Sequence, residues 1–349
     1  MQKSSGYWIG VDLHSRVIQV CVLDSRGEVV FEERCNGSGL VEGRKLVGEL
    51  AVRFSGAQLT VEALGSNRWF VAACREAGLE VTVANAAKLQ LKKAGKKTDR
   101  RDAYELARRL RLGDVAKNAK TYHPTDQEYG LRQLLRRRHG LVSSRTALVS
   151  QIRAMLRSHR APQPRGDLYG NQALKSLRAT ELANPLETAV LRTLLEALEA
   201  LQTAVSNLDL LIESQSKQGA PAVLRLLPYV GPLTATTLVA ELGDVHRFRN
   251  SKAVGSYAGL VPRVIESGQR SYHGPLVNHG NRELRFVLGE WAVQLLARNE
   301  LVKRWAQPRL KRSPKNQVRV ALARRLLVGV WHTLRTGEAF NLERCLALT

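Results

Sequence analysis

Four carboxylates in the first third of the chain have the residue type and spacing that phosphoryl chemistry needs. Asp12 lies in IGVDLH, Glu62 in LTVEAL, and Asp99 and Asp102 lie three residues apart in KTDRRDA. Four like charges at one point repel each other unless divalent cations lie between them, and an oxygen-rich set suits Mg²⁺ or Mn²⁺. Such cations polarise a phosphate and activate an attacking oxygen. This tetrad is therefore a candidate catalytic and metal-binding site.

Each of these carboxylates also has a plainer explanation. An Asp after a strand is often a turn residue or a helix cap, and Asp99 follows Thr98, so it would open a helix. Arg100 and Arg101 would neutralise both aspartates of KTDRRDA. The same two arginines are candidate ligands for a nucleic-acid phosphate.

Ser267, in VIESGQRSYH, is a candidate nucleophile. A serine hydroxyl attacks a phosphodiester only with help from a base or metal and with positive charge on the phosphate. Arg263 and Arg270 flank Ser267 and are candidates for that charge. Ser–Gly pairs are also common in ordinary turns, and Ser271, four residues on, is an alternative nucleophile.

The apolar patterning predicts the elements that position the tetrad. Three strands, then helix, strand, helix, strand and helix are expected at about 7–11, 17–23, 28–34, 39–54, 58–63, 67–76, 79–83 and 99–112. This order predicts an α/β sheet of the ribonuclease H type, with the first strands antiparallel and the later ones parallel. Strands one and four would be neighbours, so Asp12 and Glu62 would project at one edge. Asp99 and Asp102 would share one helix face.

The rest of the chain is predicted to be mostly helical. A long helix is expected from about Thr125 to Ser158, and a second from about Leu186 to Glu213 with apolar residues at alternating steps of three and four. The two are expected to pair as a coiled coil, within one chain or between chains. A loop is expected around Ser267. The predicted division is 1–122, 123–218 and 219–349.

Pro228–Gly231 resembles the turn of a helix–hairpin–helix module. Such a turn points backbone N–H groups from a helix N-terminus at a phosphate, which makes Gly231 a candidate contact. A plain helix–loop–helix explains the same residues equally well.

The charge indicates a polyanionic partner. Lys and Arg number 54 against 31 Asp and Glu, a formal net charge of +23. The first long helix is rich in arginine and nearly free of acids, which favours binding to DNA or RNA over a solvated charged face. Its candidate contacts are Arg136, Arg137, Arg138 and Arg145.

Several classes are disfavoured. No apolar run is long enough to span a bilayer, and the first residues lack the apolar core of a signal peptide. The four cysteines form no CxxC pair, so neither a zinc site nor a disulfide framework is indicated. A reducing bacterial cytoplasm, close to the nucleoid, is the expected location.

The combination of GVDLHS, VEALGS and KTDRRDA with the later LLPYVGPLTATTLVAELGD, YAGLVPRVIESG and NHGNRELRFVL resembles the DEDD-type insertion-sequence transposases. This is the IS-one-ten and IS-eleven-eleven family, which includes the Piv-type DNA invertases. The resemblance spans about Gly6 to Arg298. His14 departs from the commonest family pattern and is not expected to affect the chemistry.

The resemblance implies a RuvC-like N-terminal domain whose tetrad binds Mg²⁺, and a serine, here Ser267, that joins DNA covalently. It also implies a structured guide RNA from the element itself, donor and target DNA, and a dimer or tetramer. Two other functions remain open: a RuvC-like nuclease or junction resolvase that does not use the serine, and a non-catalytic nucleic-acid-binding protein.

Overall fold

The computed structural model describes residues 6–36, 40–89, 98–267, 270–277 and 279–347. The chain packs as two compact units, Met1–His123 and Pro124–Thr349. Within the described residues, no helix is long and apolar enough to cross a membrane. The division into three functional regions stays a prediction.

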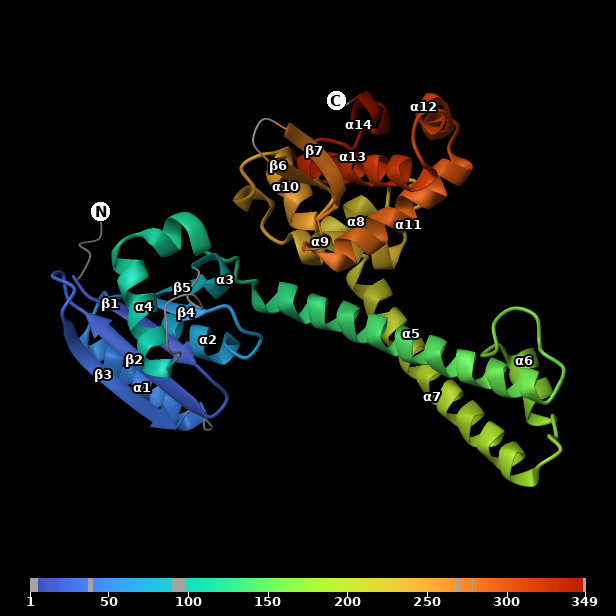
Figure 1. Cartoon of the computed structure of the whole chain (residues 1–349), viewed down its shortest axis with the longest axis horizontal. Helices are drawn as coiled ribbons and strands as arrows, with labels where there is room; N and C mark the ends of the chain where they lie inside the picture. Colours follow the sequence, from blue (N-terminus) through green and yellow to red (C-terminus); the bar gives the residue numbers. More distant parts are fainter. Residues whose placement is uncertain (1–5, 37–39, 90–97, 268–269, 278, 348–349) are drawn as a thin grey trace. The chain divides into compact units, whose positions relative to one another are not determined.

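The first unit is built on a five-stranded sheet in the order β3-β2-β1-β4-β5 (Figure 1). β2 pairs antiparallel with both β1 and β3, whereas β1–β4 and β4–β5 are parallel. The predicted ribonuclease H-type sheet is therefore confirmed. The strands are β1 (Trp8–Leu13), β2 (Val17–Leu23), β3 (Val29–Asn36), β4 (Gln58–Glu62) and β5 (Glu80–Ala84).

Helices cover both faces of this sheet. On one face, α1 (Leu40–Arg53) and α2 (Arg68–Glu76) bury a core that includes Ile9 and Val11 of β1. Because side chains alternate along a strand, Gly10 and Asp12 face the other side, where α4 (Asp99–Arg111) lies. The short α3 (Ala86–Leu89) and the π-helical turn η2 (Val115–Ala119) complete the unit.

The backbone of α4 lies directly against β1. A Cβ built on Gly10 would be 2.1 Å from the Ala103 carbonyl oxygen and 2.4 Å from the Ala107 amide nitrogen, far inside any real contact. Ala103 and Ala107 are fully buried on the facing side of the helix. Only a glycine at this strand position lets the helix come so close. The first turn of α4 is thereby brought to the end of β1.

Two long helices pair within the second unit. α5 (Asp126–Ser158) and α7 (Pro185–Gln215) run antiparallel, joined through α6 (Asn171–Arg178) (Figure 1). The direction follows from their contacts: Arg138 binds Asp209, and His159 lies 3.1 Å from Glu187. The predicted pairing of the long helices therefore occurs within one chain.

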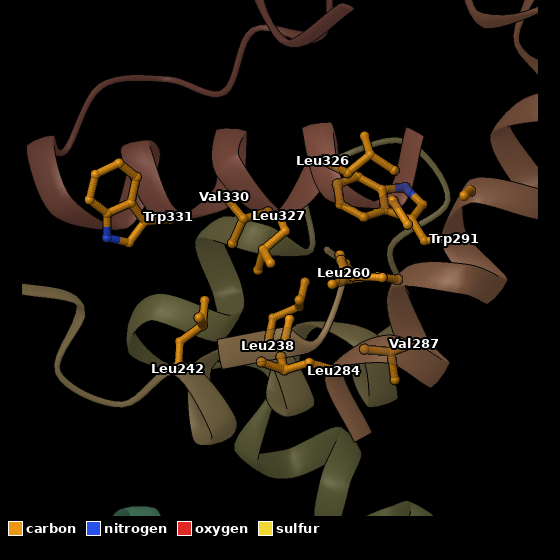
Figure 2. Close-up of a cluster of buried hydrophobic side chains, with 14 of the residues drawn as sticks. Leu238, Leu242, Leu260, Leu284, Val287, Trp291, Leu326, Leu327, Val330 and Trp331 are labelled. Atoms are coloured by element: carbon orange, nitrogen blue, oxygen red, sulfur yellow. The ribbon is translucent and has the colours of Figure 1, made fainter. Parts of the chain in front are cut away.

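The rest of the second unit is a helical core, apart from one two-stranded hairpin, β6 (Pro262–Ser267) and β7 (Arg270–Leu276). Figure 2 shows leucine, valine and tryptophan side chains from several helices meeting in this core, including Leu238, Leu284 and Trp291. The remaining elements are α8 (Gly219–Leu224), α9 (Pro232–Leu242), η3 (Val245–Arg247), α10 (Ser251–Ala258), α11 (Arg282–Arg298), α12 (Glu300–Leu310), α13 (Lys315–Thr336) and α14 (Leu342–Ala347).

Glu241, only 1% exposed, fastens α5 to this core. Its carboxylate accepts hydrogen bonds from Arg136 at 3.0 Å and from the Asn281 side-chain amide at 2.7 Å. Arg132 donates to the carbonyl oxygens of Ala240 and Glu241 at 2.7 and 3.2 Å. A buried charge is stable only when its neighbours bind it in this way. The network therefore fixes α5, α9 and the start of α11 relative to one another.

We expect Gly10→Ala to lower the free energy of unfolding by about 2 kcal/mol or more, because the new methyl group must push α4 away from β1. Urea denaturation of the full chain measures this loss. Gly48→Ala is the matched control. Gly48 lies within α1 with nothing near its would-be Cβ, so alanine there is neutral or stabilising by about 0.5–1 kcal/mol. A Gly10→Ala protein as stable as the wild type would refute the close-packing argument.

Glu241→Ala is expected to cost on the order of 3 kcal/mol, because it removes the buried carboxylate that Arg132 and Arg136 contact at 3.6 and 3.0 Å. The tryptophan fluorescence of the helical core reports this loss during denaturation. Glu290→Ala, at an exposed position of α11, should change stability by less than about 0.5 kcal/mol. Equal effects of the two substitutions would show that Glu241 is not a structural hub.

Candidate active site

Asp12 and Glu62 lie side by side at one edge of the sheet. In the parallel pairing of β1 with β4, Val11 is the partner of Val61, so the next residue of each strand is the acidic one. The buried Asn67 donates from its side-chain amide to the Glu62 carbonyl oxygen at 2.7 Å and holds the turn after β4. The carboxyl ends of neighbouring parallel strands thus carry both groups.

Asp99 and Asp102 occupy the first turn of α4. The helix is capped by Thr98, whose hydroxyl accepts from the Arg101 amide at 3.3 Å, so Asp99 is not the cap. Arg100 binds Glu32 of β3 at 3.0 and 2.5 Å. Capping and neutralisation by Arg100 therefore do not account for the two aspartates. The Arg101 side chain is exposed.

His14, which from the sequence is not expected to affect the chemistry, lies beside Asp12 and Asp99. Its Nε2 lies 3.2 Å from Asp12 Oδ2 and 3.8 Å from Asp99 Oδ1. One donor atom from each of the three residues lies within 4.8 Å of the others, which is close enough to hold one metal ion. The turn between β1 and β2 sets this position, because the His14 amide donates to the Val17 carbonyl oxygen at 2.9 Å.

Asp12 is held in an unfavourable environment for a carboxylate. It is 3% exposed, and burial raises its pKa to about 6, with His14 opposing the rise and Asp102, Asp99 and Glu62 adding to it. Its Oδ2 lies at ion-pair distance from His14, yet within the described residues it accepts no hydrogen bond. A buried oxygen with no hydrogen bond, surrounded by acidic groups and an imidazole, fits a divalent cation.

Ser267 lies at the end of β6, so the expected loop is in fact a hairpin. Ser267 is opposite Arg270 in the pairing of β6 with β7, and Glu266 is opposite Ser271. Gly268 and Gln269 between the strands lie outside the described residues, as do the side chains of Ser267, Arg270 and Ser271. Arg263 of β6 is exposed. The β-branched residues of VIES and a two-residue connection were the missed signal for a hairpin.

Three of the four candidate arginines of α5 are engaged inside the second unit. Arg136 binds Glu241, and Arg138 binds Asp209 of α7 at 2.7 Å. Arg145 donates to Gln202 and lies 4.1 Å above the Tyr169 ring. Arg137 is exposed. These contacts connect α5 to other parts of the second unit. Binding of the four arginines to nucleic acid stays a prediction.

Gly231 directly precedes the first turn of α9, where Pro232 supplies no N–H. A Cβ built on Gly231 would meet nothing within 4 Å, so the position is open. The short α8 before it and α9 after it form the expected helix–turn–helix arrangement. The phosphate contact at Gly231 stays a prediction.

We expect Asp12→Asn to stabilise the metal-free protein in a pH-dependent way. A carboxyl whose pKa is raised on folding costs stability above its folded pKa, and this cost disappears as the pH falls below its unfolded value. With a rise from 3.8 to about 6, the gain is on the order of 3 kcal/mol near pH 8 and less than about 1 kcal/mol near pH 4.

Denaturation with a chelator present measures this gain at both pH values. Asp24→Asn is the opposite case, since backbone hydrogen bonds, led by that from Glu28, lower the Asp24 pKa. It should not stabilise the protein at either pH. A gain for Asp12→Asn that is equal at both pH values would contradict the electrostatic explanation.

Two family models match the chain. A DEDD transposase model covers residues 9–160, and a model of the transposase IS116/IS110/IS902 family covers residues 222–307. The chain is 26% identical over 340 residues to the transposase for insertion sequence element IS1111A of Coxiella burnetii, covering 95% of this chain and 91% of that protein. It is 28% identical over 345 residues to a probable family 20 transposase of Pseudomonas aeruginosa, covering 95% and 98%.

The chain is also similar, over a shorter region, to the pilin gene-inverting protein of Moraxella bovis. The two are 31% identical over 126 residues, which cover 34% of this chain and 38% of that protein. Among solved structures, Thermus thermophilus RuvC aligns with 15% identity and a TM-score of 0.26, over 33% of this chain and 99% of RuvC. The acidic edge, which we define as Asp12, Glu62, Asp99 and Asp102, lies within the first matched region, and the hairpin of β6 and β7 lies within the second. The chain belongs to the DEDD transposases of the IS116/IS110/IS902 family.

Proposed function

We propose that this transposase cuts and rejoins DNA with two sets of residues, an acidic metal site in the first unit and a serine nucleophile in the second. The observation that supports it most is the buried Asp12, whose Oδ2 accepts no hydrogen bond from the described residues and whose carboxylate is surrounded by Glu62, Asp99 and Asp102. A structural carboxylate in that position would be hydrogen-bonded.

Asp12, Glu62, Asp99 and Asp102 would hold Mg²⁺ or Mn²⁺. When bound, the cation supplies charge that polarises a phosphodiester and favours loss of a proton from the attacking oxygen. Asp12 is rigid because β1 is an inner strand, and Asp99 and Asp102 are fixed by the close contact of α4 with Gly10. These residues therefore hold their positions before substrate arrives, as efficient catalysis requires.

Ser267 would act as the nucleophile. Its hydroxyl oxygen forms a new ester bond to phosphorus as the bond between phosphorus and one sugar oxygen breaks. The serine proton leaves to a base, and the freed sugar oxygen gains a proton. Attack on this phosphoserine by the hydroxyl of another DNA end reverses the exchange and frees Ser267. Exposed Arg263 on the same strand supplies positive charge near the phosphate.

The partners would be donor and target DNA and a structured guide RNA encoded by the element, bound by a dimer or tetramer near the nucleoid. The net charge of +23 supports a polyanionic partner. Arg101, Arg137 and Arg263 are exposed and available to phosphates. Arg100, Arg136, Arg138 and Arg145 would have to leave partners in the chain before binding one. Arg270 and Gly231 complete the proposed contacts.

A covalent-adduct assay tests the serine. The whole element is expressed in cells, the protein is recovered under denaturing conditions, and the DNA that stays attached is measured. We expect attached DNA in the wild type, none with Ser267→Ala, and a large decrease with Asp102→Ala. RNA recovered in a native pull-down would identify the guide.

Ser271→Ala is the matched control, because it removes the other hydroxyl of the same hairpin. Loss of the adduct with Ser271→Ala but not with Ser267→Ala would move the nucleophile to Ser271. A third outcome is that neither the wild type nor any variant forms an adduct, while DNA is nicked in a reaction that needs Asp102. The protein would then be a nuclease of this fold, and the proposed role of Ser267 would be wrong.

A further inference from the structure

His14 is the basic residue of the acidic edge. It follows β1 directly, two residues after Asp12, and its imidazole faces both Asp12 and Asp99. The proposed tetrad consists only of oxygen donors, so an imidazole nitrogen changes the kind of cation the edge prefers. The groups around His14 Nε2 show whether the imidazole acts only as a counter-charge to the carboxylates or also as a ligand of the cation.

The distances suit ligation of one ion. Ligand atoms lie about 2.0–2.2 Å from small divalent cations, so two ligands of one ion lie roughly 3.0 Å apart when adjacent and at most about 4.4 Å apart when opposite. The separations of 3.2 Å from His14 Nε2 to Asp12 Oδ2 and 3.8 Å to Asp99 Oδ1 fall inside this range. A single ion between the three groups therefore needs little rearrangement.

The contact between His14 and Asp12 is not a hydrogen bond. At 3.2 Å, a protonated imidazole serving only as a counter-charge would donate its N–H to the carboxylate. Asp12 Oδ2 nevertheless accepts no hydrogen bond within the described residues, although it lies 3.2 Å from His14 Nε2. A cation bound to both atoms would satisfy the buried oxygen and the imidazole nitrogen together. This nearly fully buried, unbonded oxygen is the independent sign of a ligand at the edge.

The exposure of the three groups is graded. Asp12 is 3% exposed, whereas the side chains of His14 and Asp99 are 46% and 40% exposed. Asp12 would anchor the ion from below, and the two exposed donors would complete the outer side while leaving positions for water or a phosphate oxygen. Catalytic metal sites keep such open positions, unlike structural ones.

We infer that His14 ligates the same cation as Asp12 and Asp99, so that the site is a mixed nitrogen–oxygen site that favours Mn²⁺ over Mg²⁺. Mg²⁺ takes oxygen ligands almost exclusively, whereas imidazole binds first-row transition metals well. This inference rests on the metal site of the proposed function and specifies its cation.

Pulsed electron paramagnetic resonance of Mn²⁺ bound to the full chain tests it directly. We expect modulation from a directly coordinated ¹⁴N in the wild type and its loss in His14→Gln. His14→Lys, which keeps a positive charge but cannot replace the imidazole in this geometry, should lose it as well. His246→Gln, at an exposed position of the second unit, should keep it. Calorimetry should show Mn²⁺ affinity falling roughly tenfold or more in His14→Gln, with Mg²⁺ affinity nearly unchanged.

Two failures are distinguishable. In the first, Mn²⁺ binds the wild type and not Asp12→Asn, but the bound ion shows no nitrogen modulation. This result would overturn the role of His14 and would leave the acidic metal site supported. In the second, Mn²⁺ does not bind the wild type, or it binds Asp12→Asn equally well. This result would overturn the metal site itself, and the role of His14 with it.

Discussion

The closeness of α4 to β1 is the constraint on which the candidate site depends. Strand and helix backbones touch at Gly10, with Ala103 and Ala107 opposite, and no side chain separates them. This contact brings Asp99 and Asp102 from a helix to carboxylates that belong to strands. The other face of the sheet packs against α1 and α2 over a separate core. One strand, β1, thus contributes to that core with one face and to the candidate site with the other.

The same geometry explains why we expect the ionised Asp12 to lower the stability of the metal-free protein. The packing that aligns Asp12 with its neighbours also removes water from it and gathers negative charge around it. Active sites commonly hold ionisable groups in environments that are unfavourable for their charged form, and the rest of the fold stabilises the arrangement. Here the inner strand and the apolar core beneath it hold Asp12 in place. Glu241 is the contrasting case, a buried carboxylate whose charge is fully bound by Arg136 and Asn281.

Much of the first unit was predictable because its signals are local. Apolar runs predict the five strands, and the ribonuclease H-type order makes β1 and β4 neighbours, which predicts Asp12 and Glu62 at one edge of the sheet. His14 carries no such signal, because the turn between β1 and β2 sets its direction. For the segment around Ser267 the sequence predicts a loop and not the observed hairpin, because Gly and Pro within the segment obscure the alternation of its strands.

The arginines of α5 show a different limit. Their neighbours in sequence are nearly all neutral or basic, so counting nearby charges predicts a free basic surface. Their partners Asp209 and Glu241 come from helices more than seventy residues away. Burial and pairing at that separation are properties of the tertiary structure and leave no trace in a local window. Arg137 is exposed as well, and none of the contacts described above involves its side chain.

The contact at Gly10 also restricts how this chain can change over evolutionary time. Positions 10, 103 and 107 share one small volume, so enlargement of any one of them must be compensated at the others or the helix must move. We therefore expect substitutions at these three positions to be coupled, because each of them changes the space that the other two share. A chain of this fold that exchanged one of the acidic residues would still need the small residues, because these serve the packing. In a descendant with a bulky residue at position 10, α4 would have to pack at a greater distance from β1. Asp99 and Asp102 would then have to reach Asp12 and Glu62 in another way.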